Sequence, residues 1–86
     1  MAITTEHELQ TARLAGCVGK DPQRLGGEPV FRGTRVPVKS LFDHLKAGET
    51  VELFLDDFPG VTKEQVRAVL DAAEVRILED ARRNRR

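Results

Sequence analysis

A change of apolar spacing at residue 38 is the feature that most constrains this fold. From there on, three successive stretches place apolar residues at i, i+3, i+4 and i+7, the period of an amphipathic helix. The first stretch begins at Val38 and the second at Val51. The third carries the apolar residues Val66, Val69, Leu70, Ala73 and Ile77. Helices with one apolar stripe each can bury those stripes against one another, so residues 38–81 predict a three-helix unit.

Start and stop signals separate the three predicted helices. Gly48 suits the position after the end of the first helix, where a positive φ is common. Thr50 is a plausible N-cap for the second helix, which Pro59 ends because a residue before proline avoids the α region. Thr62 and Gln65 have the spacing of a capping box at the start of the third helix. The second and third helices thus have the lengths and connection of a helix-turn-helix.

The residues before the three-helix unit favour short β-structure and loops. A brief strand around Cys17 is followed by residues 21–29, whose glycines and prolines are typical of a loop. Two β-prone runs then flank Gly33 and Thr34. Glycine at the first loop position suits a type II′ turn, because glycine takes a positive φ at little cost. We therefore expect a small hairpin over 29–37.

The length of 86 residues leaves room for one domain, 1–86. A capping box at Thr5 predicts a helical extension within 1–15, followed by a β-segment and loops over 16–37. An arginine-rich tail occupies 82–86. The predicted fold class is mainly α, with a three-helix unit after a short β-hairpin and a short N-terminal helix.

The net charge is zero, but the charges are unevenly spread along the chain. Residues 1–48 hold seven basic and five acidic side chains, residues 49–75 hold two and seven, and residues 76–86 hold five and two. This distribution excludes a uniformly basic nucleic-acid-binding surface. It leaves local basic patches on either side of an acidic segment, which suits a protein with two different partners better than one devoted to DNA.

The side-chain inventory argues against several function classes. No apolar run is long enough to cross a membrane, and the N-terminus has no secretory signal. With Cys17 as the single cysteine, a disulfide framework is excluded and a cytoplasmic protein is expected. His7 and His44 are interpreted as surface residues rather than partners of a catalytic cysteine. We therefore predict a protein that is not an enzyme and uses no cofactor.

Acidic residues in the second helix are the remaining metal candidates. Asp56 and Asp57 could be combined with Glu52, but adjacent carboxylates on a helix point about 100° apart and do not converge on one ion. A solvated acidic face, able to meet a basic partner, is the better interpretation, and no metal site is predicted.

Polar residues at the start of the third helix are candidate DNA contacts. Lys63 and Arg67, with Gln65 between them, lie off the apolar stripe, where a recognition helix meets bases and phosphates. Acidic residues share this polar side, namely Glu64, Asp71 and Glu74. They would repel phosphate, so a single copy would bind DNA weakly, and a homodimer would offset this by doubling the contacts.

Two groups of arginines are candidate partner contacts. Arg32 and Arg35 flank the expected turn and suit either the solvation of an edge hairpin or contact with an anionic partner. The tail carries Arg82, Arg83, Arg85 and Arg86. It is interpreted either as a solubilising end or as an arm that orders on an acidic protein surface, RNA or DNA.

One block of the sequence resembles a known signature. Its motif residues are Gly27, Pro29, Gly33, Thr34, Arg35 and Pro37. Together with Asp21-Pro22 upstream and Asp57-Phe58-Pro59-Gly60 downstream, the block resembles the small prokaryotic family first described as domain of unknown function 433. The resemblance covers about residues 15–78, and the visible departure is Phe58, where the family usually has tyrosine.

This resemblance implies a homeodomain-like helical unit preceded by a β-segment. It also implies the VapB-like antitoxin of a type II toxin–antitoxin pair, whose toxin is a PIN-like ribonuclease. Such nucleases hold divalent metal with clustered carboxylates, to which an inserted arginine would bind in bidentate fashion. The leading hypothesis is therefore an antitoxin that binds this toxin and its own promoter. The alternative is a protein-interaction module without DNA binding, which the acidic second and third helices favour.

Overall fold

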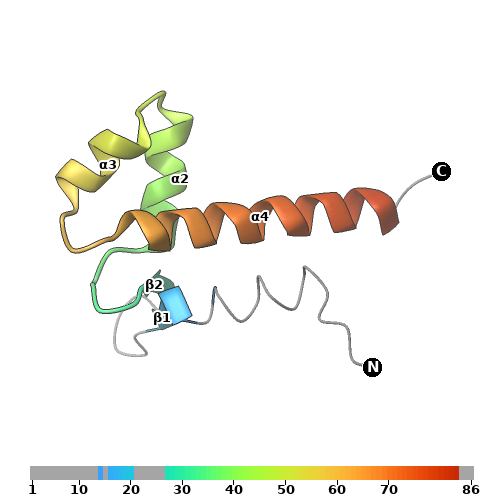
Figure 1. Ribbon diagram of the computed structural model, residues 1–86, viewed down its shortest axis with the longest axis horizontal. Coiled ribbons are helices and arrows are strands. Elements are labelled where there is room, and N and C mark those ends of the chain that lie inside the picture. The colour runs from blue at the N-terminus through green and yellow to red at the C-terminus, as the bar shows by residue number, and fades with distance from the viewer. Residues whose placement is uncertain (1–13, 15, 21–26, 84–86) are drawn as a thin grey trace.

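The computed structural model describes residues 14, 16–20 and 27–83. The elements are β1 Val18–Lys20, β2 Pro29–Phe31, α2 Val38–Lys46, α3 Val51–Asp57 and α4 Lys63–Arg83. In Figure 1, α2 and α3 lie on one side of α4 and the two strands lie on the other. A mainly helical fold with three helices after a two-stranded antiparallel hairpin is confirmed. The predicted N-terminal helix falls outside the described residues, except for Leu14.

The two strands form an antiparallel pair with a fixed register. The Cα partners are Val18 with Phe31, Gly19 with Val30, and Lys20 with Pro29. The expected hairpin within 29–37 is therefore wrong, because the strand that pairs with β2 is β1. The residues after the turn meet β2 through an isolated bridge between Val30 and Pro37. The sequence hides this pairing because β1 is three residues long and is separated from β2 by a loop rich in glycine and proline.

The turn after β2 also differs from the expected type. The backbone N–H of Thr34 donates to the carbonyl of Phe31 at 3.0 Å, so Arg32 and Gly33 are its central residues. Gly33, with φ of 81°, occupies the second central position, as in a type II turn, and not the first position of a type II′ turn. The pairing with β1 extends to Arg32, whose N–H donates to the carbonyl of Cys17 at 2.8 Å. The turn therefore lies one residue earlier in the chain than the expected turn centred on Gly33 and Thr34.

The predicted helix caps are present. Thr50 Oγ1 accepts a hydrogen bond from the N–H of Leu53 at 3.1 Å at the start of α3. At the start of α4, Thr62 Oγ1 accepts from the N–H of Gln65 at 3.1 Å, and Gln65 Oε1 accepts from the N–H of Thr62 at 2.9 Å. This reciprocal pair confirms the capping box, which satisfies two N–H groups that a helix start would otherwise leave without partners.

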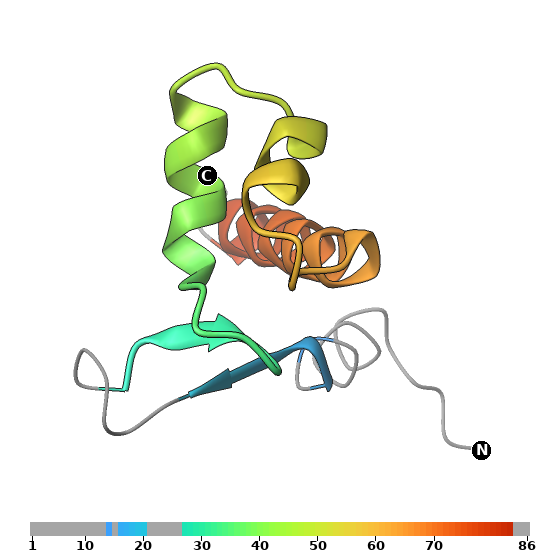
Figure 2. The same ribbon diagram turned by 90° about the vertical axis from the view of Figure 1, so that its left-hand side faces the viewer.

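The core takes side chains from every layer of the fold. Its buried members are Phe31, Leu41, Phe54, Val61, Val66 and Val69. Each fully buried Phe or Leu of this kind stabilises the fold by roughly 1.5–3 kcal/mol. The apolar stripe of α4 is confirmed at Val66 and Val69, whereas Ile77 is 66% exposed because α4 extends past α2 and α3 (Figures 1 and 2). Within the described ranges, no helix has the length and apolar character needed to cross a membrane.

Candidate functional site

Residues 32–37, here called the motif loop, are held by the side chain of Thr34. Its hydroxyl donates to the carbonyl of Phe31 at 2.7 Å and accepts from the N–H of Val36 at 3.0 Å. Both bonds are partly shielded from water, so each contributes about 0.5–1.5 kcal/mol and is costly to leave unmade. Thr34 therefore has a structural role, which is to fix the shape of the chain between β2 and α2.

The motif loop is also the surface on which the start of α4 docks. The Gln65 Nε2 group donates to the carbonyl of Arg32 at 2.9 Å and lies 3.4 Å from the carbonyl of Cys17. The segment before α4 approaches closely as well, because a Cβ at Gly60 would lie 3.5 Å from the methyl group of Thr34. One short loop thus joins the strand pair to the α3–α4 connection.

Other residues of the motif set the path of the backbone. Gly27 and Gly33 have φ of 84° and 81°, which side-chain-bearing residues rarely adopt. Pro29 begins β2, and Pro37 occupies the N-cap of α2 in an extended conformation that its ring favours. The glycines and prolines of the motif therefore have a structural role, which is to fix the backbone conformation around β2 and at the start of α2.

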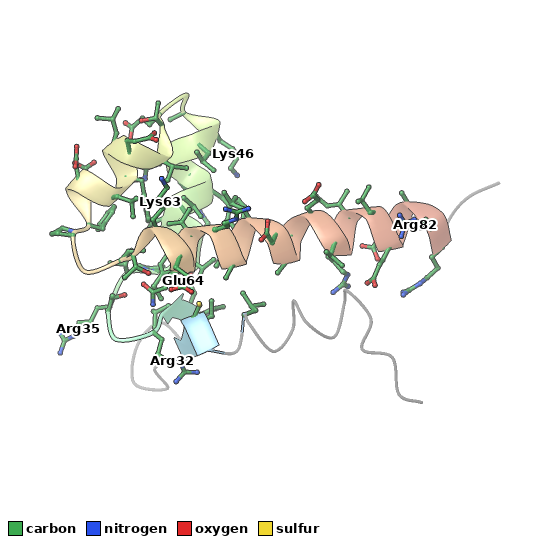
Figure 3. All side chains as sticks on the ribbon, in the orientation of Figure 1. Arg32, Arg35, Lys46, Lys63, Glu64 and Arg82 are labelled. Atoms are coloured by element: carbon green, nitrogen blue, oxygen red, sulfur yellow. The ribbon has the colours of Figure 1, made fainter. Side chains whose placement is uncertain are left out.

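The two arginines of the motif loop have different surroundings. The Arg32 guanidinium donates to the carbonyl of Val18 at 2.9 Å and lies beside Gly19, so it braces strand β1. Arg35 is exposed and extends outward from the loop in Figure 3. Arg32 therefore combines a structural contact with an exposed position, and Arg35 is the motif residue whose side chain is most clearly presented to solvent.

The predicted DNA contacts at the start of α4 are not equivalent. Lys63 is exposed and forms no salt bridge with another residue in the described part of the chain. Arg67 is 83% exposed and lies 3.9 Å from the Asp71 carboxylate, a pair worth little at such exposure. The amide of Gln65, by contrast, already bonds to Thr62 and Arg32. Lys63 and Arg67 are thus the cations that this turn of α4 presents.

The C-terminal arginines lie far from the motif loop. Arg82 and Arg83 are exposed in the last turn of α4, whereas Arg85 and Arg86 fall outside the described residues. Figure 3 places Arg82 at one end of α4 and Arg32 and Arg35 near the other. The two predicted partner-binding groups therefore do not form one basic patch.

Helix α4 carries exposed apolar side chains just before its C-terminal arginines. Ile77 is 66% exposed and Leu78 is 46% exposed. Nearer the core, a hollow of about 310 Å³ lies between β1, α2 and α4 and is lined by apolar side chains that include Val18, Phe42 and Ala73. Apolar surface beside arginine is the composition that protein interfaces favour.

Helix α3 presents an acidic outer face. Glu52, Asp56 and Asp57 are exposed, and Leu53 among them is 51% exposed. The first helix of a helix-turn-helix crosses the phosphate backbone, so acidic side chains on α3 would oppose DNA at that position. The acidic face predicted from the sequence is therefore present, and it limits how α3 and α4 could meet a duplex.

The position of His44 corrects the expectation that it is a surface residue. Its side chain is 23% exposed and packs edge-on against the rings of Phe54 and Phe58, at centroid distances of 5.3 and 5.5 Å. Helix α3 covers this side of α2, which a single-helix pattern cannot show.

The fold and the motif loop define a class of small, mainly helical domains whose last helix is anchored on a strand pair. The chain belongs to the family of proteins of unknown function DUF433, whose model matches residues 18–72. That range runs from β1 into α4 and includes the whole motif loop.

Two curated proteins show significant similarity. The chain is 41% identical over 66 residues to the uncharacterised protein y4eO of Sinorhizobium fredii, covering 77% of this chain and 30% of that protein. It is 46% identical over 52 residues to a Mycobacterium tuberculosis protein named "Putative antitoxin VapB45", covering 60% of this chain and 21% of that protein. The chain thus spans less than a third of the length of these relatives. No solved structure matches it significantly.

Proposed function

We propose that this chain is an antitoxin module, the component of a type II toxin–antitoxin pair that binds and neutralises a toxin protein. The observation that carries this proposal is the 46% identity over 52 residues to the relative named "Putative antitoxin VapB45". Membership of the same family, with the motif loop inside the matched range, supports it. In this role the module acts by binding and needs no catalytic group of its own.

The proposed partner is a PIN-like ribonuclease, the toxin class that the sequence resemblance implies. The C-terminal end of α4 is the proposed contact, because exposed Ile77 and Leu78 precede Arg82 and Arg83. The apolar pair would anchor the helix, and the arginines would pair in bidentate fashion with the metal-binding carboxylates of the nuclease. Arg85 and Arg86 would extend this contact beyond the described residues, with Arg32 and Arg35 as a second contact group.

The test uses the PIN-like product of an adjacent reading frame, co-expressed with the full chain. Deletion of residues 82–86 is expected to weaken inhibition of its ribonuclease activity at least tenfold. The control, Lys39→Ala combined with Lys46→Ala, removes positive charge from α2 instead and is expected to inhibit normally. Unchanged inhibition by the deletion variant would show that the tail does not block the nuclease, and absence of any complex would overturn the antitoxin proposal.

We also propose that a homodimer binds its own promoter through α4. Lys63 and Arg67 are exposed in the first turns of the helix, where recognition helices contact DNA. Removing two phosphate contacts from each protomer should make the plot of log binding constant against log salt concentration less steep. The magnitude of its negative slope should decrease by about 1.8 per protomer, or about 3.6 per dimer. Lys63→Ala with Arg67→Ala therefore should weaken promoter binding, and Lys46→Ala should leave it nearly unchanged. Equal gel-shift affinity and salt slope in both variants would exclude this role.

A second candidate function is a protein-interaction module that does not bind DNA. The acidic face of α3 favours it, since Glu52, Asp56 and Asp57 would approach phosphates in a helix-turn-helix complex. The two candidates differ in one measurement. A module of this second kind forms the toxin complex and shows no salt-dependent binding to its promoter.

A further inference from the structure

Three potential metal ligands from separate parts of the chain meet beside α2 and α3. His44 comes from α2, Glu49 from the loop that follows, and Asp57 from the last residue of α3. One ligand atom from each lies within 4.8 Å of the other two. His44 Nε2 is 3.5 Å from Glu49 Oε1 and 3.7 Å from Asp57 Oδ2.

The hydrogen bond at the other ring nitrogen determines what His44 offers to this cluster. Its Nδ1 lies 2.8 Å from the carbonyl oxygen of Ser40, which can only accept, so Nδ1 carries a proton and donates it. In the neutral ring, Nε2 then has a lone pair directed towards two carboxylates. In this tautomer the Nε2 lone pair is available to coordinate a cation together with the two carboxylates.

The two distances from His44 Nε2 are close to those between ligand atoms that share one metal ion. A charge-assisted N–H···O bond has a length of about 2.7–2.9 Å, and both contacts of Nε2 are longer. Ligand atoms that share a tetrahedral ion at about 2.0–2.2 Å lie about 3.3–3.6 Å apart by trigonometry. The 3.5 Å between His44 and Glu49 lies within this range, and the 3.7 Å between His44 and Asp57 lies just above it.

The surroundings of the cluster also favour a cation. His44 lies in the last turn of α2 and Asp57 is the last residue of α3. Phe54 and Phe58 hold the imidazole plane, and the Ser40 carbonyl fixes its tautomer, as outer partners do for metal-bound histidines. The Glu49 backbone is held as well, because its N–H donates to the carbonyl of His44 at 3.0 Å.

We propose that His44, Glu49 and Asp57 bind one divalent transition-metal ion, with Zn²⁺ as the ion best suited to one imidazole and two carboxylates. Three protein ligands leave a fourth position open to water or to a group from a partner. The ion would tie the end of α3 to the end of α2 and so hold the helix pair in its observed arrangement. This site is independent of the antitoxin proposal, since none of its residues is among the arginines and apolar side chains proposed to contact the toxin.

The test is titration of the full chain with ZnCl₂, followed by isothermal calorimetry and by thermal unfolding with and without Zn²⁺. We expect one ion per chain, a raised melting temperature, and retention of Zn²⁺ in excess Mg²⁺, which prefers all-oxygen octahedral sites. Glu49→Gln and Asp57→Asn are each expected to weaken binding at least tenfold. Their matched controls are Glu52→Gln and Asp56→Asn, which remove the same charge from neighbouring exposed positions and are expected to bind within about twofold.

Further variants exclude other outcomes. His44→Gln should abolish binding, and His7→Gln should leave it intact. If His44→Gln does not fold, the two carboxylate variants still decide the matter, because the Glu49 and Asp57 side chains are 44% and 59% exposed. No saturable binding, or binding that Glu49→Gln and Asp57→Asn leave unchanged, would overturn the proposal.

Discussion

The side-chain amide of Gln65 donates a 2.9 Å hydrogen bond to the main-chain carbonyl of Arg32, across 33 positions of sequence. The same side chain closes the capping box with Thr62. One residue thus both begins α4 and attaches it to the motif loop. Because the strand pair and the α3–α4 connection meet at this point, their relative placement depends on a few polar contacts in addition to the apolar core.

Gln65→Ala removes both of these interactions at once. We expect the free energy of unfolding to fall by about 1–3 kcal/mol, because the variant loses the cap, the exposed hydrogen bond to Arg32 and the partly buried contact with the carbonyl of Cys17. Gln65→Glu retains an acceptor for the N–H of Thr62 but loses the donor to Arg32. Its free energy of unfolding should therefore lie between those of Gln65→Ala and the natural sequence. Urea denaturation followed by circular dichroism measures these differences.

The control for Gln65 is Lys63→Ala in the same turn. Its side chain is exposed, so its stability should change by less than about 0.5 kcal/mol. If Gln65→Ala is as stable as this control, the contact with Arg32 does not contribute to the fold.

Thr34→Val should destabilise the motif loop. The substitution keeps the side-chain shape but removes the hydroxyl that donates to Phe31 and accepts from Val36. We expect a loss of about 1–3 kcal/mol, because the N–H of Val36 and the carbonyl of Phe31 would lose a partner in a partly buried site. Thr34→Ser restores the hydroxyl and should recover most of this loss in the same urea experiment. Stability of Thr34→Val equal to that of the natural sequence would show that the two hydroxyl hydrogen bonds do not contribute to the fold.

Gly33→Ala should be costly although there is space for the added methyl group. No atom lies within 4 Å of a Cβ at this position, but φ is 81°, where L-residues are strained by about 1–2 kcal/mol. Gly60→Ala is the matched control, because its Cβ would make an ordinary 3.5 Å contact with Thr34. Differential scanning calorimetry should show a clearly lower melting temperature for Gly33→Ala alone. A larger decrease for Gly60→Ala would contradict this account of the turn.

The exposed pair Lys39–Asp43 predicts a measurable shift in acid titration. A hydrogen bond from the Lys39 ammonium, 2.9 Å from Asp43 Oδ2, holds the pKa of the Asp43 carboxyl below its usual value. A pKa lowered by folding means that the pair stabilises the fold at neutral pH and that this contribution is lost as the pH falls through the pKa of Asp43 in the folded protein. Carbon-detected NMR titration should show this pKa rising towards the ordinary value in Lys39→Met. An unshifted pKa in both proteins would mean that the pair is not populated in solution.

Local patterns were sufficient to predict most of the helical half. The i, i+3, i+4, i+7 spacing located α2, α3 and the buried part of α4, and Thr50 and Thr62 marked two helix starts. These predictions succeed because a helix and its caps depend on residues within four positions of each other. The same spacing included Ile77 in the core stripe, although that residue is 66% exposed, because periodicity does not indicate where the packing partners end.

Contacts between distant segments could not be predicted in this way. A strand of three residues has too short an apolar pattern to predict that Val18 pairs with Phe31. Because this pairing was not predictable, neither was the position of Gly33 within its turn. The position of Gln65 on the polar side of the helix predicts a DNA contact. The sequence does not show that its amide reaches the carbonyl of Arg32. These partners are separated in sequence and meet through side chains whose geometry only the folded chain defines.

The sequence by itself therefore determined the helices, their caps, the acidic and basic segments, and the motif that marks the family. The tertiary structure alone decided that the motif loop is the docking surface for α4, and that His44 packs against Phe54 and lies close to Glu49 and Asp57. The physical reason is range. Helix formation and capping are set by neighbouring residues, whereas a shared site depends on how the buried stripes of separate elements pack.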